Sequence, residues 1–408
     1  MLSFAIKQYN GVAISASNNE DIEKETGTMI QNVTQELEPV TIIKPDTIEI
    51  KDDIETVKGP KLIFTESETD INIDIVKLLG EKYLVIRKPR GEAIRIQLED
   101  LYVTTNLKLT ISGLMEEIPD YSYIGRVNAE DVFIGEPVYI QSETVHQEED
   151  GSFTTTITKD YGNDVVNDIQ ITSLTDDLGQ STVELMLLLD HVYVHSVFED
   201  DYYYYIDLKR PREVYDRILV IDAGHGGKDA GAVSKDELTY EKNINLGILL
   251  ELKELLDRDN IKVYYTRIMD DKVFLRPRVN LANDVDCDFF ISIHSNANGS
   301  STKANGLEIL YYNHEHKGIT IKDMAKMFSE EISKTIQLRN NGILQMSNDD
   351  VLILNHATVP AILVESGYMS NLSDLDYIKS TEGQADYAVG IYNSILRAYD
   401  ELMPEQEE

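Results

Sequence analysis

Four side chains able to perform metal-dependent hydrolysis lie at the ends of predicted secondary-structure elements. His225 and His294 follow two apolar runs, Glu365 ends a third, and Glu241 opens a helical pattern. Two imidazoles and one carboxylate form an open zinc set, and a second carboxylate beside them can act as a general base. Consecutive members are 16, 53 and 71 residues apart, too far for a motif on one helix. Elements distant in sequence must therefore bring them together.

The residues after His225 favour a functional role for this imidazole. Gly226 and Gly227 let the backbone turn sharply and leave the ring uncovered, which a packing histidine would not require. Two other interpretations stay open. A histidine at a strand end is often only a hydrogen-bonded structural residue, and Gly-Gly before Lys228 could cradle a phosphate. The segment lacks both the GxxxxGK[ST] and the GxGxxG spacing, which weighs against a nucleotide site.

The elements that must position these residues alternate between strand and helix after Arg217. Short apolar runs predict strands, and longer segments with apolar residues at helical spacing predict helices. The predicted strands are 218–222, 262–266, 288–293, 306–312 and 361–365, and the predicted helices are 241–258, 276–283, 320–336 and 384–402. This alternation predicts an α/β fold, a mostly parallel sheet flanked by helices on both faces. Chemistry in such sheets collects at the carboxyl ends of the strands.

A different pattern precedes this region. Residues 61–210 hold short runs rich in Val, Ile, Tyr and Thr between turn residues, which predicts an all-β antiparallel domain. We interpret the four tyrosines 202–205 as part of its last strand, with a sugar-stacking platform as the alternative. Residues 1–60 are polar without a sustained period and predict a flexible acidic lead-in. The catalytic domain would then span residues 211–408.

Composition narrows the classes of function. The 408 residues carry 37 basic and 73 acidic side chains, a formal net charge of −36 that disfavours nucleic acid and anionic membranes as partners. The only cysteine is Cys287, so a disulfide framework and a cysteine-based zinc site are excluded. The sequence contains no apolar run of 18 residues, so we expect no membrane span, and we see no signal peptide. A missing N-terminal anchor stays open.

Beyond spacing, residues 218–402 resemble a known family, the zinc-dependent N-acetylmuramoyl-L-alanine amidases of the Amidase_3 type. The resemblance covers nearly half of the chain, and its motifs appear in the family's order. The matching segments are 221–231, 241–246, 266–267 with Leu275, Arg278, Ala282 and Asn283, then 290–297 and 360–371.

The resemblance implies roles for individual residues. His225, Glu241 and His294 match the family's ligands for Zn²⁺, and Glu365 matches its catalytic glutamate. The implied reaction, on peptidoglycan, cleaves the amide between the lactyl group of N-acetylmuramic acid and L-alanine. The implied location is extracellular, at the bacterial cell wall. We expect substrate contacts from two further residues at the same edge, Asn296 and His356.

The departures from the family pattern, at Ala223, Ala230, Ser366 and Tyr368, affect none of these ligands. Some family members plug the zinc cleft with an inserted helix between the second histidine and the glutamate. The 71 residues from His294 to Glu365 are already used by predicted elements, so we expect an open cleft.

The β-rich region resembles the AMIN-type domain that targets some of these amidases to the wall. Two alternatives for the whole chain stay open. One is a different zinc peptidase acting on peptidoglycan peptides, such as a carboxypeptidase, and the other is an inactive wall-binding regulator.

Overall fold

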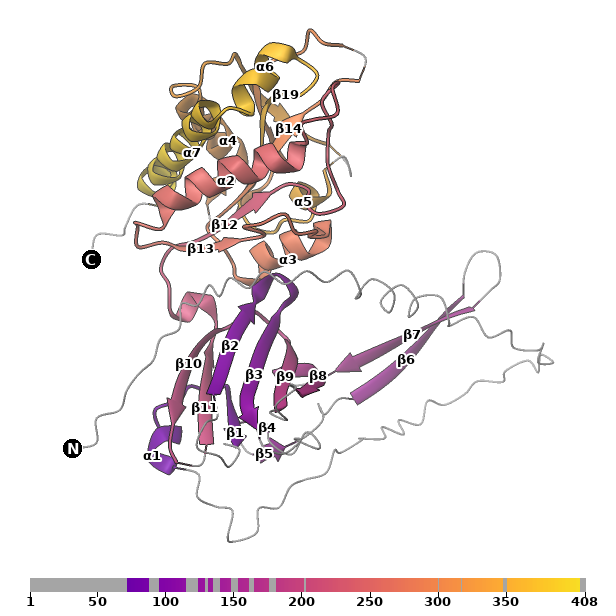
Figure 1. The fold of residues 1–408 in the computed structure, drawn as a ribbon, viewed down its shortest axis with the longest axis vertical. Helices are drawn as coiled ribbons and strands as arrows, with labels where there is room; N and C mark the ends of the chain where they lie inside the picture. The colour runs from indigo at the N-terminus through magenta and orange to yellow at the C-terminus, as the bar shows by residue number, and fades with distance from the viewer. Residues whose placement is uncertain are drawn as a thin grey trace, which may run out of the picture.

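The computed structural model places a β-rich part and an α/β part in sequence order (Figure 1). It describes residues 72–87, 95–114, 124–128, 131–134, 140–147, 153–160, 165–175, 181–201, 203–299, 301–316, 318–347 and 351–403. We call residues 72–210 the β part and residues 211–403 the α/β part. The predicted lead-in, residues 1–60, lies outside the described residues.

The α/β part is built on a six-stranded sheet with the order β13-β12-β14-β19-β15-β18. All neighbours run parallel except β15 and β19, which are antiparallel. The strands are β12 (Ile218–Ala223), β13 (Lys262–Tyr265), β14 (Phe289–Asn296), β15 (Leu307–Tyr311), β18 (Asn340–Gln345) and β19 (Ala361–Tyr368). The fold class predicted from the sequence is confirmed.

Helices cover both faces of this sheet (Figure 1). One face packs against α2 (Glu241–Leu256), α4 (Ile321–Ile332), α6 (Leu372–Ile378) and α7 (Thr381–Leu402). The other packs against α3 (Leu275–Asp284) and α5 (Leu352–Asn355). Strand β12 is buried on both faces because its residues alternate between the two cores, Leu219 and Ile221 on one and Ile218 and Val220 on the other. A short ladder joins β16 (Glu315–His316) to β17 (Ile319–Thr320).

Several elements differ from the sequence prediction: helices α5 and α6 were not predicted, and α7 and β18 differ as follows. Helix α7 begins at Thr381 rather than Gln384, because the Ser380 hydroxyl accepts a hydrogen bond from the Gly383 N–H and caps the helix. Strand β18 was not predicted. It is an edge strand with no buried side chain, so it lacks the apolar run on which the prediction relied.

The β part contains two larger antiparallel sheets that share one core, and a separate two-stranded sheet. Leu84 and Ile206 come from one sheet and Leu107 and Leu187 from the other, and all four are buried in that core. The first sheet holds β10 (Val194–Glu199), β11 (Tyr203–Lys209), β1 (Tyr83–Arg87), β4 (Ile124–Asn128) and β5 (Asp131–Ile134); the second holds β2 (Arg95–Leu101), β3 (Asn106–Leu114), β9 (Ser181–Leu189) and β8 (Val166–Thr175). The remaining elements are α1 (Ile73–Val76) and the paired β6 (Ile140–Gln147) and β7 (Phe153–Asp160).

Three of the four tyrosines of the run, Tyr203 to Tyr205, belong to β11, as the sequence predicts, and Tyr202 lies outside the described residues. Tyr203 and Tyr205 are buried and Tyr204 is partly exposed, which is the alternation expected of a strand. The Tyr205 hydroxyl donates to Asp200 and accepts from the Asn72 N–H, so it is held within the β part.

Polar contacts join the two parts at the C-terminus of α3. The Asp284 carboxylate accepts the Val192 N–H at 2.6 Å and lies 2.5 Å from His191 Nδ1 and 3.2 Å from Arg210 Nη2. The Tyr102 hydroxyl donates to the Tyr265 carbonyl at 3.0 Å.

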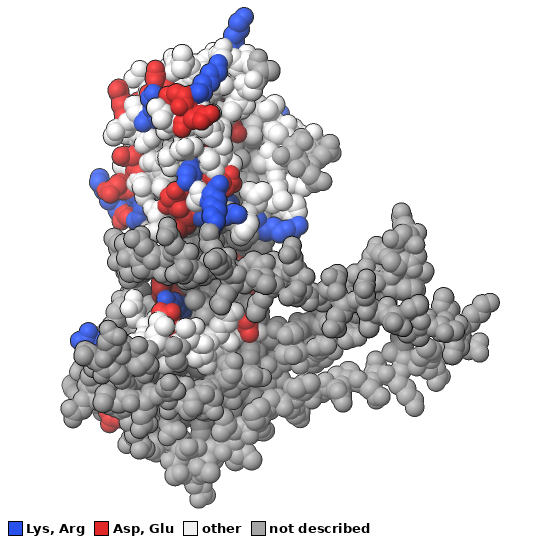
Figure 2. Space-filling model, turned by 45° about the vertical axis from the view of Figure 1, so that its right-hand side comes forward, with Lys and Arg blue, Asp and Glu red and all other residues white. Residues whose placement is uncertain are grey.

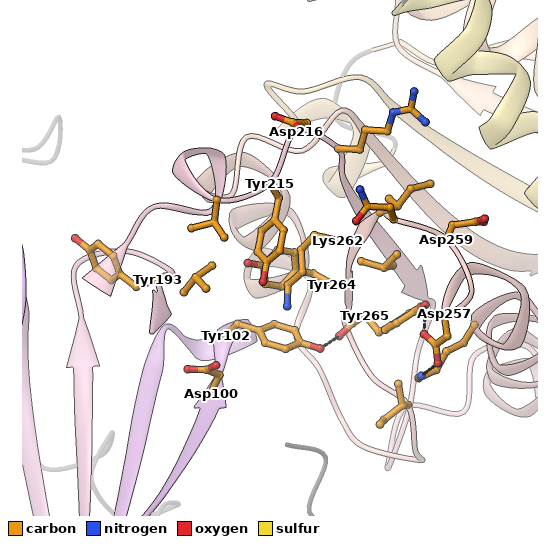
Figure 3. A pocket seen from close by; sticks show the side chains of 18 of the residues that line it. Asp100, Tyr102, Tyr193, Tyr215, Asp216, Asp257, Asp259, Lys262, Tyr264 and Tyr265 are labelled. Atoms are coloured by element: carbon orange, nitrogen blue, oxygen red, sulfur yellow. Dashed lines mark hydrogen bonds and ion pairs between the residues drawn. The ribbon is translucent and has the colours of Figure 1, made fainter. Parts of the chain in front are cut away.

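A cavity of about 740 Å³ lies beside these contacts, between β2 and β10 of one part and β13 of the other (Figure 3). Within it, the Lys262 ammonium lies 4.8 Å from the centre of the Tyr264 ring. Elsewhere on the α/β part, acidic and basic side chains lie intermixed on the face shown in Figure 2. Among the described helices, none is long and apolar enough to span a membrane.

Candidate active site

The candidate site lies at the carboxyl ends of β12, β14 and β19. Strand β12 leads into the loop that carries His225, while His294 and Glu365 lie near the ends of β14 and β19. His294 and Glu365 are paired residues of neighbouring parallel strands, so their side chains project from the same face. The expectation that distant segments meet at this edge agrees with the register of the sheet.

The loop after β12 has a backbone that requires glycine. His225 has φ +62°, and Gly226 and Gly227 follow with φ +135° and +56°. A Cβ atom on Gly226 would lie 2.0 Å from the Asp271 carbonyl oxygen, so any side chain there would force the loop apart. The Gly-Gly signal seen in the sequence therefore reflects a real turn that exposes His225.

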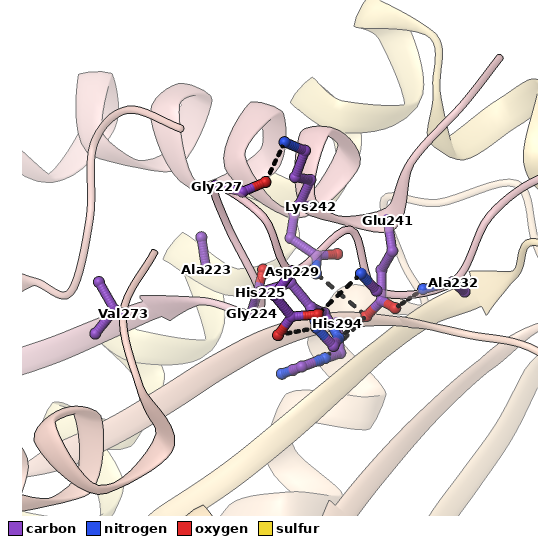
Figure 4. Close-up of polar contacts among 12 residues, drawn as sticks. Ala223, Gly224, His225, Gly227, Asp229, Ala232, Glu241, Lys242, Val273 and His294 are labelled. Carbon is purple, nitrogen blue, oxygen red and sulfur yellow. Dashed lines mark hydrogen bonds and ion pairs between the residues drawn. The ribbon is translucent and has the colours of Figure 1, made fainter. Parts of the chain in front are cut away.

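Glu241 is the first residue of α2 and lies between the two histidines. Its Oε1 atom is 3.2 Å from His225 Nε2 and 2.9 Å from His294 Nδ1. Backbone N–H groups fix the carboxylate from behind, since Oε1 accepts from Ser295 at 3.1 Å and Oε2 accepts from Ala232 at 2.8 Å. Figure 4 shows the side chains of His225, Glu241 and His294 converging from three separate segments.

The three residues have the geometry of a metal-binding cluster. One ligand atom from each of His225, Glu241 and His294 lies within 4.8 Å of the others. The space around them is shaped for close approach: a Cβ atom on Gly231 would lie 2.5 Å from Glu241 Oε2, and one on Gly224 would lie 2.2 Å from His294. Two imidazoles and a carboxylate suit a divalent cation such as zinc, and both histidines of the cluster are partly exposed.

The charges of the cluster are strongly coupled. Burial lowers the pKa of His225, but the carboxylates of Glu241 and Asp229 outweigh it and raise this pKa to about 8. Burial raises the pKa of Glu241, and the two imidazoles outweigh it and hold the value well below its ordinary range. A divalent cation would compete with protons for the nitrogen and oxygen atoms of these groups.

Glu365 has the environment of a general base. Its Oε2 atom is buried and has no hydrogen-bond partner among the described residues. Burial raises its pKa to about 7; the nearby imidazoles of His294 and His225 oppose this shift, and the carboxylates Glu241 and Glu308 reinforce it. A carboxylate with a pKa near the working pH can both take and return a proton.

The structure adds a residue that the sequence analysis missed, Glu308. It pairs with Glu365 across β15 and β19, so the row His294–Glu365–Glu308 crosses three strands. The Tyr368 hydroxyl donates to Glu308 at 3.1 Å, and Asn296 Nδ2 donates to it at 3.2 Å. The available signal was an acidic residue within the otherwise apolar strand 306–312.

The two predicted substrate contacts have different places in the structure. Asn296 ends β14, two residues beyond His294, and lies at the same edge as the cluster. His356 follows α5 and is exposed; its Nδ1 atom contacts the Leu352 carbonyl and its carbonyl accepts from Asn283. The contacts of His356 with described residues do not reach the cluster. Both assignments stay predictions.

An α/β sheet with a His/Glu/His cluster and a neighbouring carboxylate is the kind of site used by metal-dependent hydrolases. Comparison with known proteins agrees with this class. The profile of the N-acetylmuramoyl-L-alanine amidase family matches residues 219–397.

Individual relatives match the same region. The N-acetylmuramoyl-L-alanine amidase CwlM of Bacillus licheniformis is 32% identical over 184 residues, covering 45% of this chain and 68% of that protein. The probable cell wall amidase LytH of Staphylococcus saprophyticus is 35% identical over 164 residues, covering 40% of this chain and 52% of LytH. The crystal structure of an N-acetylmuramoyl-L-alanine amidase from Clostridium difficile 630 is 33% identical, with a TM-score of 0.43, and covers 45% of this chain and 97% of that one. This chain belongs to the N-acetylmuramoyl-L-alanine amidase family.

Proposed function

We propose that the chain hydrolyses the amide between the lactyl group of N-acetylmuramic acid and L-alanine in peptidoglycan, using zinc held by His225, Glu241 and His294. The observation that carries this proposal is the convergence of these three side chains, beside Glu365, in a member of this amidase family. The charge of the set fits a divalent cation, because one carboxylate and two neutral imidazoles leave the bound ion with a positive charge.

The residues of the proposed active site have distinct tasks in this reaction. His225, Glu241 and His294 would hold a zinc ion, which would supply Lewis acidity toward a carbonyl oxygen and would lower the pKa of a water molecule. Glu365 takes a proton from the attacking water and later delivers it to the leaving amine nitrogen of L-alanine. Ser295 and Ala232 hold the Glu241 carboxylate through their N–H groups, which fixes the direction of its oxygens.

We also propose that the cleft is open without a regulatory partner. The longest described helix between His294 and Glu365 is α4, and its buried residues Met324 and Phe328 belong to the core of the α/β part. Because α4 packs against β15, β18 and α7, it forms part of the core and does not cover the cluster.

The place of action and the role of the β part follow from the same proposal. The relative LytH carries the name of a cell wall amidase, which supports action at the cell wall, outside the cell. We propose that residues 61–210 form an AMIN-like targeting domain and that residues 211–408 form the catalytic domain. A sedimentation assay with insoluble peptidoglycan tests the targeting role: β-part surface variants should lose binding to the sediment while still cleaving soluble fragments.

The products of digestion test the reaction itself. Soluble peptidoglycan fragments digested by the full chain should yield stem peptides with a new free N-terminal L-alanine. Release of D-alanine instead would identify a carboxypeptidase and overturn the proposal. If the parent and Glu365→Ala were equally inert, the chain would be a wall-binding protein rather than an enzyme.

A further inference from the structure

Two buried arginines contact the backbone of residues 223–225, the segment that carries His225 of the cluster. Arg267 and Arg278 are only 4% and 2% exposed, and both donate to main-chain carbonyl groups next to His225. Neither guanidinium contacts an imidazole or the Glu241 carboxylate within hydrogen-bond distance. Their hydrogen bonds reach the cluster only through the backbone.

Arg278 holds the first and last carbonyl groups of the segment 223–225. It donates through Nη1 to the Ala223 oxygen at 2.7 Å and through Nη2 to the His225 oxygen at 2.8 Å. Its charge is balanced by Asp222, whose Oδ1 lies 2.5 Å from Nη1 and which is itself fully buried. The Asp222 carboxylate also accepts from two hydroxyl groups, those of Thr266 and Ser292.

Arg267 ties this loop to the helix that carries the third member of the cluster. It donates through Nε to the Ala223 oxygen at 2.9 Å and through Nη2 to the Gly224 oxygen at 2.9 Å. The same Nη2 donates to the Lys242 oxygen at 2.8 Å, one residue beyond Glu241. One guanidinium therefore fixes the spacing between the two backbone segments that carry His225 and Glu241.

The conformation of the loop explains why such clamps are needed. His225 is a non-glycine residue with φ +62°, a left-handed conformation that the surrounding structure must impose. Three consecutive carbonyl groups near a buried strand end also need donors, because an unpaired buried carbonyl is unfavourable. Only a planar, multi-donor guanidinium can reach several of them at once, so lysine would replace few of these bonds.

We propose that Arg267 and Arg278 are positioning residues that fix the backbone of residues 223–225 and hold the cluster in its metal-binding geometry before an ion arrives. This inference rests on the proposed function for its metal, but the preformed loop is a property of the metal-free chain. A purely structural arginine would support the fold without changing metal affinity once the fold is intact.

The test compares Arg267→Lys and Arg278→Lys with a matched control, Arg276→Lys, on the full-length chain. Arg276 is exposed on the same helix as Arg278. Zinc affinity, measured by competition with a chromophoric chelator, should fall about 10- to 100-fold in the two buried variants, as for other residues that orient metal ligands, and stay unchanged in the control. Folded variants with the affinity of the parent would overturn the inference.

Hydrogen exchange supplies a readout that needs no variant. In the metal-free parent, a peptide covering residues 222–232 should already be protected, and zinc should add little. Strong protection that appears only with zinc would show that the ion orders the loop, and the inference would fail even if the arginine variants did not fold. A parent that binds no zinc but keeps a protected loop would instead refute the proposed function and leave the preformed loop intact.

Discussion

The two parts of the molecule differ in what they bury. Among the residues whose burial is described, the β part buries one polar side chain, Asp207, whereas the α/β part buries fourteen. Buried polar groups are unfavourable unless each finds a partner. Those around the cluster have partners that lead back to a ligand: Asp222 to Arg278 to the His225 carbonyl, and Asn245 to Glu241. The comparison shows that polar burial is concentrated where it positions chemistry, while the β part is held by an apolar core.

The largest expected effect separates chemistry from fold. Glu365→Gln keeps the shape of the side chain but removes the proton acceptor, so turnover of peptidoglycan fragments should fall by about 10³-fold. Zinc content should not change, because Glu365 is not among the proposed ligands. Glu254→Gln, an exposed position on α2, is the control and should retain parental turnover. Retention of turnover in Glu365→Gln would remove the general base from the mechanism.

Breaking the buried charge network should cost stability as well as metal affinity. Asp222→Asn leaves the Arg278 guanidinium buried without its counter-ion, and we expect a loss of about 3–5 kcal/mol in the free energy of unfolding. The exposed control Asp216→Asn should change it by less than about 0.5 kcal/mol. Urea denaturation of the metal-free chain measures both. If Asp222→Asn were as stable as the parent, this network would not support the α/β part.

A substitution that creates a cavity in the core of the β part should lower the stability of the protein without changing zinc affinity or turnover. Leu107 and Leu187 are about 1% exposed or less, and Leu107→Ala should destabilise the β part by about 2–5 kcal/mol. Zinc affinity and turnover on soluble fragments should stay within about twofold of the parent at temperatures where the variant is folded. A parallel loss of zinc affinity would show that the two parts are coupled, and the contrast between them would break down.

The smallest effect is the pH dependence of zinc binding. Zinc requires a neutral imidazole, and the pKa of His225 in the metal-free chain is raised to about 8, so affinity should rise about tenfold per pH unit from pH 6 and level off near pH 8. The same raised pKa stabilises the metal-free fold fully below about pH 6.5, and this contribution is lost as the pH rises through about 8. Asp229→Asn removes one of the two carboxylates and should move the midpoint to lower pH. Zinc affinity that is constant from pH 6 to pH 8 would contradict the raised pKa of His225.

How much could be predicted from the sequence depended on local signals. The strand 218–222 and the helix 241–258 were predictable because apolar spacing indicates burial directly, although the helix ends at Leu256 in the structure. The Gly-Gly pair after His225 indicated an exposed loop. Edge strand β18 gave no such signal, since its side chains are polar or half exposed.

The supporting contacts of the site were not predictable in the same way. That Glu308 faces Glu365 depends on β15 running antiparallel to β19, a pairing that residue patterns do not specify. The sequence indicated that Arg267 and Arg278 belong to a motif. Their role could not be predicted, because it depends on which carbonyl groups of the folded loop accept their hydrogen bonds.

The most direct test of the central claim is zinc analysis of the full chain combined with X-ray absorption at the zinc edge. We predict one zinc per chain, with nitrogen and oxygen ligands at about 2.0–2.2 Å, no sulfur, and loss of the metal in His294→Ala. A chain that takes up no zinc when it is supplied in excess, or a zinc that remains in His294→Ala, would contradict the assignment of His225, Glu241 and His294.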